Sequence, residues 1–208
     1  MSNEVKTKEK IDMDPKYIIK LTVTLFVTCV IVAAALGGVN AITADRIAAI
    51  NQANTAKAIT EVMPDMEGDP ITLELTEEMT AAASSAGGSI TEAYEAQAGG
   101  ATIGYALKIV ASGSQGNIEM MVGVDAEGVV TGVSIVDNSE TSGIGSKVMA
   151  NEPTATGVGV LTQFEGKSAA DGTLSVGSNV DAISGATVST KGVTTGVNAA
   201  LAVAGVIG

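Results

Sequence analysis

The 208-residue sequence contains no histidine and no tryptophan, and Cys29 is its only cysteine. Without histidine the chain has no imidazole base and no histidine-ligated metal. A single cysteine cannot form an internal disulfide, a zinc site or a protein-held iron–sulfur cluster. We therefore predict no metal site and no catalytic side chain in this protein.

Positive charge is also scarce, because 11 Lys and Arg face 23 Asp and Glu, a net charge of −12. A nucleic-acid-binding surface needs basic side chains to neutralise phosphates, so we predict no nucleic-acid partner. The charges are unevenly distributed. The first 20 residues carry five lysines and four acids, whereas the remaining 188 carry six basic and 19 acidic residues.

One long uncharged run lies between Lys20 and Asp45 and contains 24 residues. At about 1.5 Å per residue, a helix of this length spans the roughly 30 Å hydrocarbon layer of a membrane. The lysines before it place its N-terminal end in the cytoplasm. The sequence thus predicts a cytoplasmic tail over residues 1–20 and a single transmembrane helix over residues 21–44, in contact with lipid in the cell (inner) membrane.

A cleaved signal peptide is the alternative interpretation of this run, since Val39–Ala41 (VNA) is an acceptable cleavage site. The apolar core of a signal peptide is usually about 7–15 residues, which favours a retained anchor here.

The chain beyond the anchor is predicted to be extracytoplasmic. Residues 42–62 are rich in Ala and contain no Gly or Pro, which favours a helix, and we assign residues 45–63 to a helical stalk ended by Pro64. Residues 64–208 form the outer domain. Its first part, residues 64–100, is expected to be irregular apart from a short helix around Thr76–Ala83.

Three runs rich in β-branched residues follow, over residues 101–111, 117–125 and 129–137. Turn residues separate them, and Asp125–Gly128 (DAEG) indicates a hairpin, so we predict an antiparallel sheet of at least three strands.

A final helix is predicted from about Ser189 to Val203. Its apolar stripe comprises Val193, Val197, Ala200, Leu201 and Ala204 and is expected to pack on the sheet, whereas Thr194, Thr195 and Asn198 face elsewhere. The predicted fold class is α+β: an N-terminal transmembrane helix followed by an antiparallel sheet packed by helices.

A stretch with four hydroxyl side chains, DAISGATVST at residues 181–190, precedes this helix. Ser and Thr at a helix N-terminus commonly cap the free backbone N–H groups. The same N–H groups and the helix dipole also favour a phosphate, and Gly185 allows close approach. No GKS or GKT follows and no G-x-G-x-x-G precedes the helix, so neither a Walker loop nor a dinucleotide fingerprint is present. Both interpretations, a cap or a phosphate site, remain open from the residues alone.

The segment Asp181–Thr187 (DAISGAT) resembles the D-x-x-[ST]-G-A-T flavinylation motif of the FMN-binding domain family. In that family a flavin transferase takes FMN from FAD and esterifies its phosphate to the last threonine of the motif. The resemblance implies covalent FMN on Thr187. The motif residues that the transferase would recognise are Asp181, Ser184, Gly185 and Ala186.

A second segment, Glu140–Gly145 (ETSGIG), resembles the E-T-P-G-L-G loop that lies beside the flavin in the same family. Ser142 stands where Pro is usual and Ile144 where Leu is usual. The resemblance implies cofactor contacts from Glu140, Thr141, Gly143 and Gly145.

With its anchor and stalk, the whole chain resembles the G subunits of Rnf electron-transport complexes. This implies an electron-carrying flavoprotein, a redox subunit rather than a complete enzyme, in a ferredoxin:NAD⁺ oxidoreductase coupled to Na⁺ or H⁺ translocation. Its partners would be other membrane subunits of the complex and, for maturation, a flavin transferase. Two alternatives are the C subunit of a sodium-pumping NADH:quinone oxidoreductase (Nqr) and a membrane-anchored binding module without a cofactor.

Overall fold

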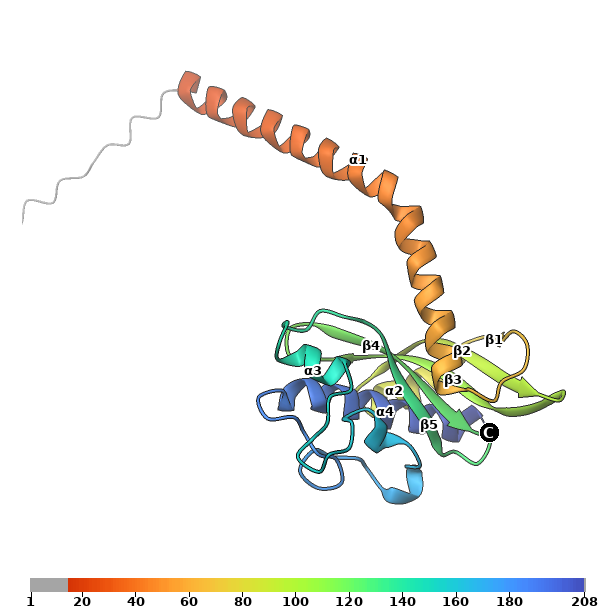
Figure 1. Ribbon diagram of the computed structural model, residues 1–208. Helices are drawn as coiled ribbons and strands as arrows, with labels where there is room; N and C mark the ends of the chain where they lie inside the picture. The colour runs from red at the N-terminus through yellow and green to blue at the C-terminus, as the bar shows by residue number, and fades with distance from the viewer. Residues whose placement is uncertain (1–14, 208) are drawn as a thin grey trace, which may run out of the picture. The chain divides into compact units, whose positions relative to one another are not determined.

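The computed structural model describes residues 15–207 (Figure 1), so the predicted cytoplasmic tail lies outside the described residues as far as residue 14. Four α-helices are present in this range: α1 (Pro15–Val62), α2 (Glu77–Ser85), α3 (Gly145–Met149) and α4 (Thr187–Ile207). The five strands are β1 (Ile71–Leu73), β2 (Ser89–Ala98), β3 (Ala101–Ser112), β4 (Asn117–Asp125) and β5 (Val130–Asn138). They form one antiparallel sheet in the order β1-β2-β3-β4-β5, which confirms the α+β prediction.

The first helix, α1, is continuous from the uncharged run into the predicted stalk. It is long and apolar enough to cross a membrane, and none of its most apolar window is buried within the chain. The chain divides within this helix into two compact units, one ending at Ile50 and the other beginning at Asn51.

One face of the sheet is covered by α2 and α4 (Figure 1). Val193 and Val197 of α4 are fully buried, together with Ile118 and Met120 of β4, in the main hydrophobic core. The predicted apolar stripe of the last helix is thus confirmed. The placement of Thr194 away from the core was wrong, because only 3% of it is exposed. The helix packs against α2 as well as against the sheet, so more than one of its sides is buried.

The opposite face of the sheet receives the last turns of α1, within the second unit. Ile59 and Val62 are 2% and 1% exposed and pack in a second core with sheet residues. The Thr131 hydroxyl donates a 2.5 Å hydrogen bond to the carbonyl oxygen of Val62. A side chain at Gly132 would place its Cβ 3.3 Å from the Val62 Cα, so the small residue lets this helix end lie close to β5.

The prediction that residues 64–100 are irregular was wrong in part. The short helix there is confirmed as α2, with Thr76 as its N-cap, but β1 and β2 were missed. The β2 sequence (SITEAYEAQA) contains three Ala and two Glu, which are depleted in strands, and its conformation comes from pairing with β3. Gly99 and Gly100 both have positive φ, +59° and +81°, as a tight hairpin turn requires.

The three strands expected from residue 101 onward are confirmed as β3, β4 and β5. The last helix, α4, begins two residues before and ends four residues after the expected range, so Thr187 is its first residue. This start places the flavinylation-like motif directly in front of the helix.

Candidate functional site

The segment Asp181–Thr187 forms a turn that leads into α4. Ile183 and Ala186 are buried in the main core, whereas Ser184, Gly185 and Thr187 are exposed. The Ala186 N–H donates a 2.9 Å hydrogen bond to the Ile183 carbonyl oxygen and closes the turn. Gly185 has φ of +85°, a conformation that disfavours any other residue at this position. Two buried apolar anchors therefore present three exposed motif residues to solvent.

The N-terminus of α4 offers free hydrogen-bond donors. Its first helical bond runs from the Thr190 N–H to the Ala186 carbonyl oxygen, at 3.0 Å. Within residues 15–207, the backbone N–H groups of Thr187, Val188 and Ser189 have no acceptor. Ala186, which precedes the helix, has no side-chain oxygen to cap them. Three free donors and the positive end of the helix dipole suit an anion such as a phosphodiester.

The four hydroxyls of the motif stretch have different environments. Thr190 donates to the Ala186 carbonyl oxygen at 3.0 Å, and Ser189 donates to Glu140. The hydroxyls of Ser184 and Thr187 make no hydrogen bond to any described residue, and both side chains are exposed. None of the four caps α4 in the described part of the chain, so the phosphate interpretation fits this geometry better than the cap.

Asp181 is held through its backbone. Its N–H donates to Gln163 Oε1 at 2.7 Å, and its carbonyl oxygen accepts from Gln163 Nε2 at 2.9 Å. The Asp181 carboxylate accepts one bond, from the Thr156 hydroxyl at 3.2 Å, and remains exposed. This charge can therefore contact a second protein at the surface.

The second motif, Glu140–Gly145, joins β5 to α3. Thr141 and Gly143 are exposed, whereas Gly145 is buried. Gly143 has φ of +83°, and its N–H donates to the Ser146 hydroxyl at 2.8 Å. Figure 1 shows α3 beside the beginning of α4, which places this loop near the first motif.

Glu140 links the second motif to the helix turn that follows the first motif. Its Oε2 accepts a 2.6 Å hydrogen bond from the Ser189 hydroxyl on the first turn of α4. Its Oε1 accepts from the backbone N–H of Ser114, also at 2.6 Å. The two motifs are separated by 35 residues in the chain and adjacent in the fold, but the Glu140 carboxylate is directed at protein groups.

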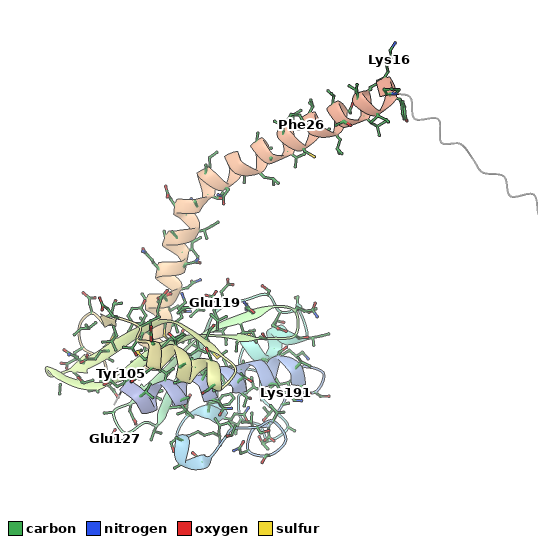
Figure 2. The ribbon with its side chains drawn as sticks, turned by 180° about the vertical axis from the view of Figure 1, so that it is seen from behind. Lys16, Phe26, Tyr105, Glu119, Glu127 and Lys191 are labelled. Carbon is green, nitrogen blue, oxygen red and sulfur yellow. The ribbon has the colours of Figure 1, made fainter. Side chains whose placement is uncertain are left out.

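Two residues near Thr187 were not identified from the sequence. Ser189 was counted only as one of four hydroxyls, and its pairing with Glu140 depends on tertiary contact. Lys191 lies one turn after Thr187, is exposed and is labelled in Figure 2. It makes no ion pair with another described residue. Its i,i+4 spacing from Thr187 puts both side chains on one helix face, and this signal was available in the sequence.

A separate cleft of about 370 Å³ lies on the other face of the sheet, within the second unit, and contains no predicted site residue. Thr55, Ile59, Tyr94, Glu92 and Lys108 are among its lining residues. Burial and a hydrogen bond donated to Glu92 raise the pKa of Tyr94 to about 12. The Lys108 ammonium lies 3.0 Å from Glu92 Oε1 and pairs with it.

Two family models match separate parts of the chain. The FMN-binding domain family matches residues 113–202, which include both motifs, and the RnfG N-terminal region matches residues 13–62. The G subunit of the Na⁺-translocating ferredoxin:NAD⁺ oxidoreductase complex of Acetobacterium woodii is 35% identical over 214 aligned residues, covering 96% of this chain and 97% of the relative. The chain belongs to the family of Rnf complex G subunits.

Two further members of this family support the assignment. The G subunit of the proton-translocating ferredoxin:NAD⁺ oxidoreductase complex of Clostridium ljungdahlii is 37% identical over 112 residues, covering 52% of this chain and 57% of the relative. The G subunit of an ion-translocating oxidoreductase complex of Methanosarcina acetivorans is 27% identical over 192 residues, covering 90% and 95%. The chain is accordingly a redox subunit of a multi-subunit membrane complex, with an FMN-binding domain and other Rnf subunits as partners.

Proposed function

We propose that this subunit carries electrons in a ferredoxin:NAD⁺ oxidoreductase complex coupled to Na⁺ or H⁺ translocation, with FMN joined by a phosphoester bond to Thr187. The observation that supports the attachment site is the exposed, unbonded Thr187 hydroxyl at the first position of α4, beside three free backbone N–H groups. This donor set fits a phosphodiester.

Maturation requires a flavin transferase that uses FAD. The Thr187 hydroxyl attacks the phosphorus on the FMN side of FAD, the bond between the two phosphates breaks, and AMP leaves while the hydroxyl proton passes to solvent or to the transferase. The transferase would contact the exposed residues Asp181, Ser184 and Gly185, whereas buried Ala186 fixes the turn.

The chain's own residues hold and orient the modified threonine. The N–H groups of Thr187, Val188 and Ser189 would hold the phosphodiester, and Lys191 would add positive charge on the same helix face. The exposed Thr141 and Gly143 would contact the flavin. Bound FMN supplies the electron-transfer chemistry, and the protein supplies position and electrostatic environment.

The proposed topology places residues 1–20 in the cytoplasm, residues 21–44 across the lipid bilayer in a single pass, residues 45–63 as a stalk and residues 64–208 outside. An impermeant thiol reagent tests it in cells, in a Cys29→Ala background. The outer probe is placed at Glu127, which is exposed. Glu127→Cys should be labelled and Val5→Cys should not, and the reverse pattern would invert the topology.

The attachment is tested by in-gel flavin fluorescence of the denatured protein, expressed with and without the transferase. The wild-type chain should fluoresce only with the transferase, and Thr187→Val should not fluoresce at all. Thr187→Ser keeps a hydroxyl and should retain part of the signal. Fluorescence from Thr187→Val would show that another residue carries the flavin.

The same fluorescence samples also test the alternative of a binding module without a cofactor. A cofactor-free binding module, for which the 370 Å³ cleft would be the site, predicts no fluorescence in any lane although the transferase modifies a control substrate.

A further inference from the structure

The Glu140 carboxylate connects three segments of the chain. It accepts hydrogen bonds from the backbone N–H groups of Ser114 and Gln115, at 2.6 and 3.3 Å, in the turn between β3 and β4. Its other oxygen accepts the 2.6 Å bond from the Ser189 hydroxyl on α4. Glu140 itself belongs to the loop that enters α3. One side chain therefore joins a sheet turn, this loop and the start of the helix that begins at Thr187.

The space around this carboxylate is kept free by two glycines. A Cβ at Gly113 would overlap Glu140 Oε1, and a Cβ at Gly145 would overlap Glu140 Oε2 and lie 2.7 Å from the Glu140 Cβ. Gly145 is buried and neither glycine has a positive φ, so backbone conformation does not explain their small size. Both glycines leave room for the carboxylate, whose partial burial is compensated by three hydrogen-bond donors.

The Ser189–Glu140 bond is the one hydrogen bond, within the described range, between residues 140–146 and residues 181–190. We propose that Glu140 is a positioning residue, whose carboxylate holds the loop at Thr141–Ile144 against the first turn of α4 and so fixes the surroundings of Thr187. Glu140 then acts through reach and hydrogen bonding, without touching the flavin. The consequence for flavin attachment rests on the proposed function of Thr187.

Variants at Glu140 show whether the length of its side chain or the charge of its carboxylate holds the loop. Glu140→Gln keeps the length and an accepting oxygen, and its amide can donate to the Ser189 hydroxyl. Glu140→Asp keeps the charge but is one methylene shorter, and Ser189→Ala removes the donor from the helix side. Glu127→Ala, at an exposed glutamate of the β4–β5 turn (Figure 2), is the matched control.

The first measurement is amide hydrogen exchange of the full-length protein in the Thr187→Val background, which carries no flavin under the proposed function. Glu140→Asp and Ser189→Ala should each speed exchange across residues 140–146 by about tenfold, the value of one lost hydrogen bond. Glu140→Gln and Glu127→Ala should stay within about twofold of the parent. Unchanged exchange in both Glu140→Asp and Ser189→Ala would overturn the proposal.

The second measurement is the initial rate of flavinylation of the same variants with Thr187 restored. Glu140→Asp and Ser189→Ala should slow it by about tenfold, and Glu140→Gln should retain most of the rate. A slow Glu140→Gln beside a normal Glu140→Asp would mean that the charge matters instead of the reach, which contradicts the proposal. No flavin on the wild-type chain would overturn the proposed function, while the exchange data would still decide whether Glu140 holds the loop.

Discussion

Helices α1 and α4 are both long and apolar enough to cross a membrane, but their surroundings differ. None of the most apolar window of α1 is buried within the chain, whereas 56% of that of α4 is buried. Eleven residues of α4 are buried, including polar Ser189, Thr190 and Thr194. Apolar composition therefore does not decide whether a helix faces lipid or protein. A helix that packs inside a domain has buried residues, and α1 has none between Pro15 and Ile50.

The largest difference between the two helices should appear when a charged residue is introduced into each of them. Val193→Asp would bury an unpaired carboxylate in the main core. This should cost at least ~4 kcal/mol, whereas the whole free energy of unfolding of a domain is typically ~5–15 kcal/mol. The outer domain should unfold, as shown by loss of amide protection in β3 and β4. Val27→Asp, in the uncharged run, should leave that protection intact but weaken membrane insertion by ~3 kcal/mol.

Membrane fractionation and hydrogen exchange on both variants check this prediction. If Val27→Asp removed protection from the sheet, α1 before Ile50 would belong to the folded core and the contrast between the helices would be false. If Val193→Asp remained folded, α4 would be able to move away from the sheet.

Glycine-to-alanine substitutions should also destabilise α4 more than α1, by a smaller amount. At Gly192 the added Cβ would lie 2.6 Å from the Ser112 carbonyl oxygen, a backbone atom, so we expect a loss of about 1–3 kcal/mol. At Gly196 it would meet the sulfur of Met120, a flexible side chain that can shift, so the loss should be smaller.

Gly37 of α1 has no atom within 4 Å of the added Cβ, so Gly37→Ala should not destabilise the chain and should favour the helix by ~1 kcal/mol. Thermal unfolding in lipid nanodiscs tests the expected order of destabilisation, in which Gly192→Ala has the largest effect, Gly196→Ala a smaller one and Gly37→Ala none. Destabilisation by Gly37→Ala would contradict the open surroundings of this glycine.

The smallest expected effect concerns the end of α1, which is buried on the other face of the sheet beside Tyr94. Burial and the bond to Glu92 raise the Tyr94 pKa to about 12, so the stabilisation from the neutral phenol is present below about pH 10 and is lost as pH rises towards 12. Solvent screening limits it to ~1 kcal/mol or less. Tyr94→Phe should remove this part of the alkaline loss, measured by denaturant unfolding at pH 9 and 11.5.

Glu92 should contribute to the dependence of stability on pH in the acid range. Burial opposes its ionisation, but the bonds from Tyr94 and Lys108 outweigh burial and hold the pKa of Glu92 below its usual value. Its stabilising contribution is present above the ordinary carboxyl range and is lost as pH falls through the lowered pKa. Glu92→Gln should therefore flatten the acid side of the stability profile. An unchanged profile would mean that the ion pair with Lys108 adds nothing to stability.

Part of the candidate site could be predicted from the sequence because it depends on local chemistry. Gly185 permits the left-handed turn, and the residues after it form a helix, so an exposed Thr187 beside free N–H groups follows from residues 181–190. Glu140 was expected to contact the cofactor. Its hydrogen bonds to Ser114 and Ser189 join residues far apart in the chain, and no local pattern encodes them.

The uncharged run of α1, the β3–β5 strands and the apolar stripe of α4 can all be predicted from short segments, because side-chain periodicity and hydropathy are local properties. Tertiary structure alone decided that β2 is a strand, since its Ala- and Glu-rich residues become extended by pairing with β3. It also decided that α4 is buried while α1 before Ile50 is not, because burial depends on which surfaces meet. The same contacts bring Glu140 to the start of α4.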